Sequence, residues 1–340
     1  MLEFDRGYVQ LCAEIAYNEV MMESYFNEAD EENNSNDKNK KEGLGKRIAG
    51  LFKTIAGFIK KLWNKVITFI TEKFAEISEK LKEKFDKSKE EPTDEEEIKQ
   101  ESFVESLMEM VLTESDDDIK GVNINEFSNL IMQYVDNTNK LLSKAKDVVF
   151  ENIDKAQDKI FNDKNAQIDR ISSNIEENKD VKYAKYYLLQ SIDDRFTTGT
   201  RDWYEERAYK NAFGVYPEKY NNLIKESTSS GKPKFEKTDI TNHAQNLLKE
   251  IKKSSKCYQD LEAKCAAEVH KVENKEFDSQ LLAKYIHLHL NVLQKLYSEG
   301  SSSFVTLYQF LSKAIFEATS YLIKYEKYEK YKSTKYKPSF

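Results

Sequence analysis

The stretch LGKRIAGLFKTIAGFIKKLWNKVITFITEKFAEISEKLKEKF, residues 44–85, decides the fold of this chain. Its apolar residues recur every eleven positions, in three columns. The columns are Leu44, Ile55, Val66 and Ile77; Ile48, Ile59, Ile70 and Leu81; and Phe52, Trp63, Phe74 and Phe85. Eleven residues make three turns at about 3.67 residues per turn, so each column stays on one side of a straight α-helix. The spacing predicts one long amphipathic helix over residues 43–87.

The opposite side of this helix is cationic. Residues 43–71 contain six basic residues and no Asp or Glu, so this segment has a net charge of +6. Lysines in the middle of a helix are costly inside a bilayer, so no transmembrane segment is predicted here. Three interpretations of the apolar side are open: it packs on the core of its own chain, it lies on an anionic membrane surface, or it fills the groove of a partner.

For the membrane and partner interpretations, the sequence names a set of candidate binding residues. They are Lys46, Arg47, Ile48, Phe52, Lys53, Ile55, Ile59, Lys60, Lys61, Trp63, Lys65, Val66 and Ile70.

The composition favours helices throughout the chain. Of 340 residues, 33% are charged and 39% are apolar, and only 10 are Gly and 4 are Pro. So few chain-breaking residues argue against a many-turned all-β fold and against a conventional α/β enzyme. We expect an all-α fold: an elongated helical bundle with long helices, and a separate N-terminal amphipathic helical arm.

Charge and apolar spacing divide the chain into four predicted parts. Residues 1–42 form an acidic N-terminal helix and linker, and residues 43–87 form the cationic helix. Residues 88–120 form an acidic linker with a short helix, and residues 121–340 form a helical bundle with a basic Tyr/Lys tail. The net charge is −8 over residues 1–32 and −12 over residues 90–118. These acidic blocks flank the cationic helix, so we expect them to mask it.

Within the predicted bundle, several boundaries follow from the spacing of apolar residues and from capping residues. One helix is expected from residue 122 to about residue 175, capped by Asn123 or Asn125, and either straight or kinked near Asn162–Asn165. Another is expected from about residue 239 to residue 272. Gly300–Ser303 is expected to separate two antiparallel helices, residues 278–298 and 304–331. Residues 227–234 are expected to form an exposed loop.

No motif of catalysis, cofactor binding or metal binding stands out. His287 and His289 are two residues apart, about 200° around a helix, so they cannot hold one metal ion between them. Cys257 and Cys265 are too far apart on one helix to form a disulfide. The chain is therefore predicted not to be an enzyme, with no cofactor and no metal site. The cluster Asp193–Arg195 is expected to be either an anion site or a local helix cap.

The C-terminal tail alternates tyrosines with lysines. Tyr321, Tyr325 and Tyr328 share one helical face, and six lysines surround them: Lys324, Lys327, Lys330, Lys332, Lys335 and Lys337. Stacking tyrosines with phosphate-binding lysines would suit a nucleic-acid partner. The same pattern also suits the soluble end of a core helix.

The layout of the first 120 residues resembles that of virion-associated proteins of tailed bacteriophages and prophages from low-GC hosts. The resemblance rests on the acidic start MLEFDRGYVQLCAEIAYNEVMMESYF, the polar linker, the helix KRIAGLFKTIAGFIKKLWNKVITFI and the helical body rich in Lys, Asn, Ile and Tyr. It implies a non-enzymatic structural or head-packaged protein whose partners are other virion proteins or itself. It also implies a location in the virion or the host cytoplasm, and no signal peptide is expected. The alternative is a pore-forming helical effector, masked by its acidic segments.

Overall fold

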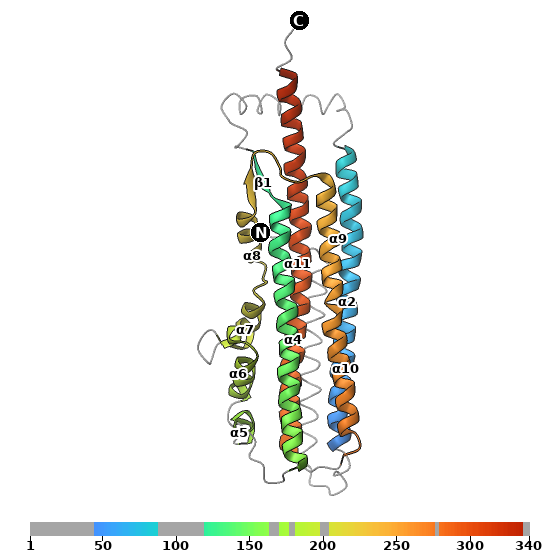
Figure 1. Ribbon diagram of the computed structural model, residues 1–340, viewed down its shortest axis with the longest axis vertical. Helices are drawn as coiled ribbons and strands as arrows, with labels where there is room; N and C mark the ends of the chain where they lie inside the picture. Colours follow the sequence, from blue (N-terminus) through green and yellow to red (C-terminus); the bar gives the residue numbers. More distant parts are fainter. Residues whose placement is uncertain are drawn as a thin grey trace. The chain divides into compact units, whose positions relative to one another are not determined.

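The computed structural model describes residues 44–87, 119–162, 170–176, 181–197, 204–275 and 279–335 (Figure 1). The predicted acidic parts, residues 1–42 and 88–118, lie outside the described residues. The described chain is helical apart from one two-stranded ribbon, which confirms the predicted all-α helical bundle with long helices.

The helices and strands follow the chain in a simple order. The helices are α2 (Leu44–Lys87), α4 (Ile124–Asn162), α5 (Arg170–Glu176), α6 (Val181–Ile192), the 3-10 helix η4 (Asp194–Thr197), α7 (Tyr204–Phe213), α8 (Lys219–Glu226), α9 (Lys237–Lys253), α10 (Ser255–Val272) and α11 (Gln280–Lys335). The strands are β1 (Lys120–Val122) and β2 (Thr228–Ser230).

The chain forms two compact units, each built from three stretches of sequence. Unit 1 comprises the described residues within 44–69, 134–216 and 251–306. Unit 2 comprises the described residues within 70–133, 217–250 and 307–335. Helices α2, α4 and α11 each contribute residues to both units.

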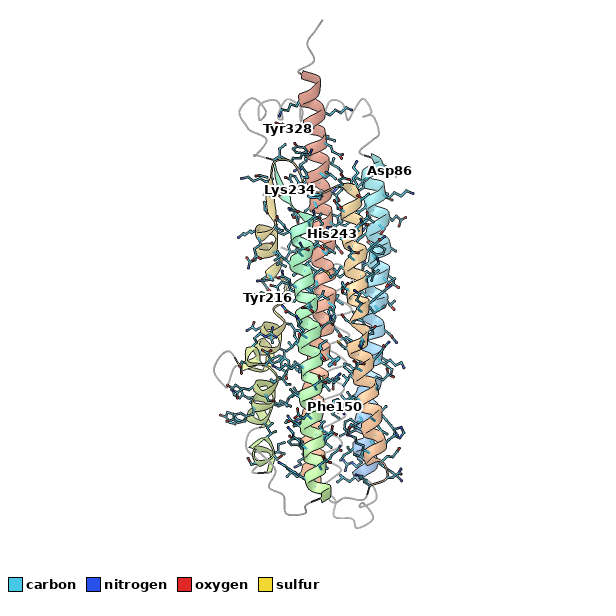
Figure 2. All side chains as sticks on the ribbon, viewed as in Figure 1. Asp86, Phe150, Tyr216, Lys234, His243 and Tyr328 are labelled. Carbon is cyan, nitrogen blue, oxygen red and sulfur yellow. The ribbon has the colours of Figure 1, made fainter. Side chains whose placement is uncertain are left out.

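In unit 1, parts of α2, α4, α10 and α11 run side by side (Figure 1). The rings of Phe52 on α2 and Phe150 on α4 are stacked with their centroids 6.2 Å apart; Phe150 is labelled in Figure 2. The Tyr297 hydroxyl of α11 donates to the backbone carbonyl oxygen of Leu142 on α4. α2 is therefore packed into the bundle and does not stand apart as an arm. This matches the interpretation in which its apolar side covers the core of its own chain.

In unit 2, the two strands pair antiparallel, with Gly121 opposite Ser229. The backbone N–H of Asn123 donates to the carbonyl oxygen of Ser227 at 2.8 Å, which joins the end of β1 to the start of β2. The side chain of Asn123 then caps α4, because its Oδ1 accepts a hydrogen bond from the N–H of Asn125 at 3.2 Å. This confirms Asn123 as a cap. The prediction of an exposed loop over residues 227–234 was wrong for β2.

The prediction of a helix break at Gly300–Ser303 was also wrong, because α11 is one helix of 56 residues. A Cβ atom added at Gly300 would lie 3.0 Å from Cδ1 of Leu142, so the glycine allows α4 and α11 to approach closely. The Ser303 hydroxyl donates to the carbonyl oxygen of Glu299 at 2.8 Å, within the helix. Small residues serve close packing here and do not end the helix.

Two other predicted helices extend over more than one observed helix. The structure describes α4 to Asn162 and α5 from Arg170, and residues 163–169 lie outside the described residues. The helix expected to reach residue 272 is interrupted at Ser254, between α9 and α10. Asp239 lies in the first turn of α9. Its Oδ2 accepts a hydrogen bond from the N–H of Glu236 at 2.8 Å, which is a capping interaction at the start of the helix.

Candidate functional site: the two sides of helix α2

The apolar side of α2 is buried. Ile48, Phe52, Ile55, Ile59, Val66 and Ile70 have no exposed surface. Trp63 is 7% exposed; its ring is stacked on Tyr258 with centroids 4.2 Å apart and meets Phe304 edge-on at 5.9 Å. The apolar members of the predicted binding set are thus buried, and two of them, Phe52 and Trp63, contact aromatic residues of the chain's own α4, α10 and α11.

The start of α2 lies close to the end of α10. A Cβ atom added at Gly45 would lie 2.5 Å from the carbonyl oxygen of Val272 and 2.8 Å from that of Lys275. By contrast, Cβ atoms added at Gly50 or Gly57 would meet no atom within 4 Å. Of these three glycines of α2, only Gly45 is therefore required by packing.

The cationic side of α2 faces outward. Lys46, Lys53, Lys60, Lys61 and Lys65 are exposed, and Arg47 is half-buried. Lys53 pairs with Glu273 at 2.8 Å, and Lys60 pairs with Glu262 of α10 at 3.0 Å. The hydrogen bond from Lys53 lowers the pKa of Glu273. Both ion pairs are exposed to solvent, so they stabilise the α2–α10 contact only weakly.

Glu262 and Glu273, the acids that pair with Lys60 and Lys53, both belong to unit 1. The predicted masking by residues 1–32 and 90–118 concerns residues outside the described part of the chain, and it stays a prediction. Two of the five exposed lysines, Lys53 and Lys60, pair with acids on or just after α10. All five lysines are exposed to solvent, so they form a ridge of lysines along the outward side of α2.

Beyond residue 70, α2 continues in unit 2 with alternating charges. Glu76 accepts hydrogen bonds from Lys73 and Lys80, and these bonds lower its pKa. Ile77 and Leu81 are buried, and Lys237 lies over the ring of Phe85 at 5.1 Å. This half of the helix is a packed, charge-balanced element.

Two histidines, His243 and His289, make hydrogen-bond contacts within their own units. Nε2 of His243, labelled in Figure 2, lies 2.6 Å from Oδ1 of Asn125, and burial lowers the pKa of His243. His289 is fully buried, and its Nδ1 contacts the carbonyl oxygen of Tyr285 at 2.8 Å. No group of three or more metal-binding side chains occurs in the part of the chain that the structure describes.

The two described cysteines are free thiols. Cys265 is buried, and this burial raises its pKa to about 12. Burial also raises the pKa of Cys257. Thiols with raised pKa values carry little thiolate at neutral pH, so their nucleophilic reactivity is low.

Asp193 and Arg195 form a local ion pair. The Arg195 guanidinium donates to both carboxylate oxygens of Asp193, at 2.8 and 3.0 Å, and lowers the pKa of that carboxyl. The backbone N–H of Arg195 also donates to Asp193. This geometry matches the cap interpretation of the cluster.

The tyrosines of the tail face inward. Tyr321, Tyr325 and Tyr328 are each less than a tenth exposed. The Tyr321 hydroxyl donates to the carbonyl oxygen of Gly231 at 2.7 Å, and its ring lies against Phe235. The face expected to stack on nucleic-acid bases is thus part of the core of unit 2.

Unit 1 contains a buried polar network that the sequence pattern does not predict. Glu268 has no exposed surface and accepts hydrogen bonds from Gln157 at 3.2 Å and from Lys271 at 2.6 Å. Lys271 also bridges to Asp154; burial opposes ionisation of Asp154, but the lysines around it outweigh this and lower its pKa. The Glu268–Lys271 spacing of three on one helix was the only local signal.

No family model matches the chain, and comparisons with curated proteins and with solved structures also found no match. Among the described helices, none combines the length and the apolar character needed to cross a membrane.

Proposed function

We propose that this protein is a non-enzymatic helical-bundle component of a larger assembly, of the virion-associated kind that its N-terminal layout resembles. In this proposal, the outward side of α2 is the docking surface. The observation that carries it is the division of α2 into a buried apolar side and an exposed lysine ridge over residues 44–69. Since the apolar side of α2 is already covered, a partner would contact the exposed lysines. An acidic protein surface would be complementary to these lysines.

The test measures whether the protein is incorporated into phage particles. A tagged chain is expressed in a host that produces such particles, and the particles are purified on a density gradient. We expect the chain to co-migrate with them, and we expect Lys46→Glu combined with Lys61→Glu to reduce its incorporation. Lys249→Glu combined with Lys252→Glu is the matched control, because it makes the same charge change on exposed positions outside α2. Failure of the unmodified chain to co-migrate would contradict the proposal.

A second function, that of a membrane-perturbing effector, is favoured by how α2 is held. Its ion pairs to Glu262 and Glu273 are exposed, and Gly50 and Gly57 weaken the helix without serving any packing contact. In this function, α2 leaves the bundle and binds an anionic lipid surface, where the lipid acyl chains cover its apolar side.

Trp63 reports on that release, because it is stacked on Tyr258 in the packed state. The chain has two tryptophans, so Trp203→Phe leaves Trp63 as the only indole. We would measure quenching of Trp63 by brominated lipid in anionic vesicles and in zwitterionic vesicles. Quenching on anionic vesicles alone would support the effector function, whereas an unquenched, blue-shifted Trp63 in both would refute it.

A further inference from the structure

Unit 2 contains a hollow of about 500 Å³ whose rim is rich in lysine. Lys84 of α2, Lys120 of β1 and Lys324 of α11 line it, so the three cations converge from three separate elements. The only acidic side chain among its described lining residues is Glu317, which accepts a hydrogen bond from the Tyr220 hydroxyl at 2.8 Å. The described lining therefore has a surplus of two positive charges.

The three lysines lack an acidic partner among the described residues. Lys84 is half-buried, and its Nζ donates to the hydroxyl of Ser320 at 2.8 Å and contacts the carbonyl oxygen of Phe316 at 3.5 Å. No described carboxylate pairs with Lys84, Lys120 or Lys324. A partly desolvated cation without a counter-ion is energetically unfavourable. An anion that enters this hollow therefore gains more binding free energy than it would at an open surface. The same burial lowers the pKa of Lys84.

One wall of the hollow is fixed in place. Gly121 of β1 lies directly on the ring of Tyr321, where a Cβ atom would overlap the ring atoms. The Tyr321 hydroxyl is bound to Gly231, just after β2. The ribbon therefore holds Lys120 at the rim without rearrangement, and such preorganisation favours binding.

We propose that this hollow binds a small anion carrying at least two phosphate groups, held by Lys84, Lys120 and Lys324. Lysine binds phosphate as a point charge. The Ser320 hydroxyl donates to the carbonyl oxygen of Phe316 at 2.9 Å and accepts from Lys84, so it positions the Lys84 ammonium group. The volume falls within the range of small-molecule sites and exceeds the needs of a single phosphate. This site is independent of the docking surface on α2.

The first test is calorimetric titration of the full chain with inorganic pyrophosphate at low salt. Removing one charged hydrogen-bond partner should weaken binding by roughly tenfold or more. We therefore expect Lys84→Gln and Lys324→Gln each to weaken pyrophosphate binding by that factor. Lys84→Arg should retain most of the affinity of the unmodified chain. Lys82→Gln and Lys327→Gln are matched controls, because these exposed lysines lie on the same helices but do not line the hollow. Circular dichroism verifies that each variant is folded.

A second arm distinguishes a free phosphate compound from a lipid headgroup. Sedimentation with phosphatidylcholine vesicles doped with phosphatidic acid is measured with and without pyrophosphate. Pyrophosphate binding that depends on Lys84 and Lys324, without vesicle binding, assigns the site to a free compound. Vesicle binding that depends on the same lysines and is competed by pyrophosphate assigns it to a headgroup. No binding in either arm, or equal weakening by the control variants, would overturn the proposal.

Discussion

Three glycines of α2 provide a graded test of how this helix is packed. Gly50 and Gly57 meet open space, so replacing either by alanine only raises helix propensity. Each change should stabilise the fold by about 0.5–1 kcal/mol. The two sites are about 10 Å apart along the helix, so their effects should add to about 1–2 kcal/mol.

Gly45→Ala should have the opposite sign. Its Cβ would lie 2.5 Å from the carbonyl oxygen of Val272, whereas carbon–oxygen contacts are normally about 3.3 Å or longer. The obstacle is backbone, which cannot rotate away as a side chain can. Overpacking of this kind costs about 1–3 kcal/mol, which exceeds the gain in propensity. We therefore expect a net loss of up to about 2 kcal/mol.

The assay is urea unfolding followed by far-UV circular dichroism, with the midpoints of all three single variants compared with the unmodified chain. Emission of Trp63 in a Trp203→Phe background gives a second, local signal from α2. Stabilisation by Gly45→Ala equal to that by Gly50→Ala would show that these positions are equally uncrowded and that α2 is not packed on the end of α10.

Three further changes test other parts of the fold. Trp63→Ala removes a ring stacked on Tyr258 and should cost about 3–5 kcal/mol in urea unfolding; a loss below about 1 kcal/mol would mean that the ring is not buried. Gly121→Ala should lower the thermal midpoint, because its Cβ would overlap Tyr321, and an unchanged midpoint would contradict the ribbon's position. Burial lowers the pKa of His289 from 6.5 to about 4, so between these values the unfolded chain binds a proton that the folded chain does not. Stability is therefore retained above pH 6.5 and falls towards pH 4, by up to about 3 kcal/mol. His289→Gln should remove that part of the pH dependence in urea titrations, and an identical pH profile would count against it.

Regular spacing made the long helices predictable. The eleven-residue repeat predicted α2 within one residue at its start, and the structure places Ile48, Phe52 and Ile55 on one buried side as the columns require. What covers that side was left open, because an amphipathic pattern is the same for a core, a lipid surface and a partner. The covering residues, such as Phe150 and Tyr258, lie on distant segments that the pattern does not reveal.

Short sequence features gave wrong predictions where tertiary contacts determine the local structure. Glycine commonly ends a helix, but Gly300 lies inside α11. Because Gly300 has no side chain, Leu142 of α4 can pack closely against it. The strands β1 and β2 have three residues each, too few for an alternating pattern to be recognised. The lysines of the hollow come from α2, β1 and α11, so no linear motif joins them.

The central claim is that residues 44–69 of α2 are part of the bundle core. Hydrogen–deuterium exchange of the full chain tests it directly, because slow amide exchange reports on global unfolding and fast exchange on local opening. We expect the amides of residues 48–66 to exchange as slowly as those of residues 285–305 in α11. Exchange of residues 48–66 within seconds, while residues 285–305 stay protected, would show that α2 is a separate arm and not part of the bundle core.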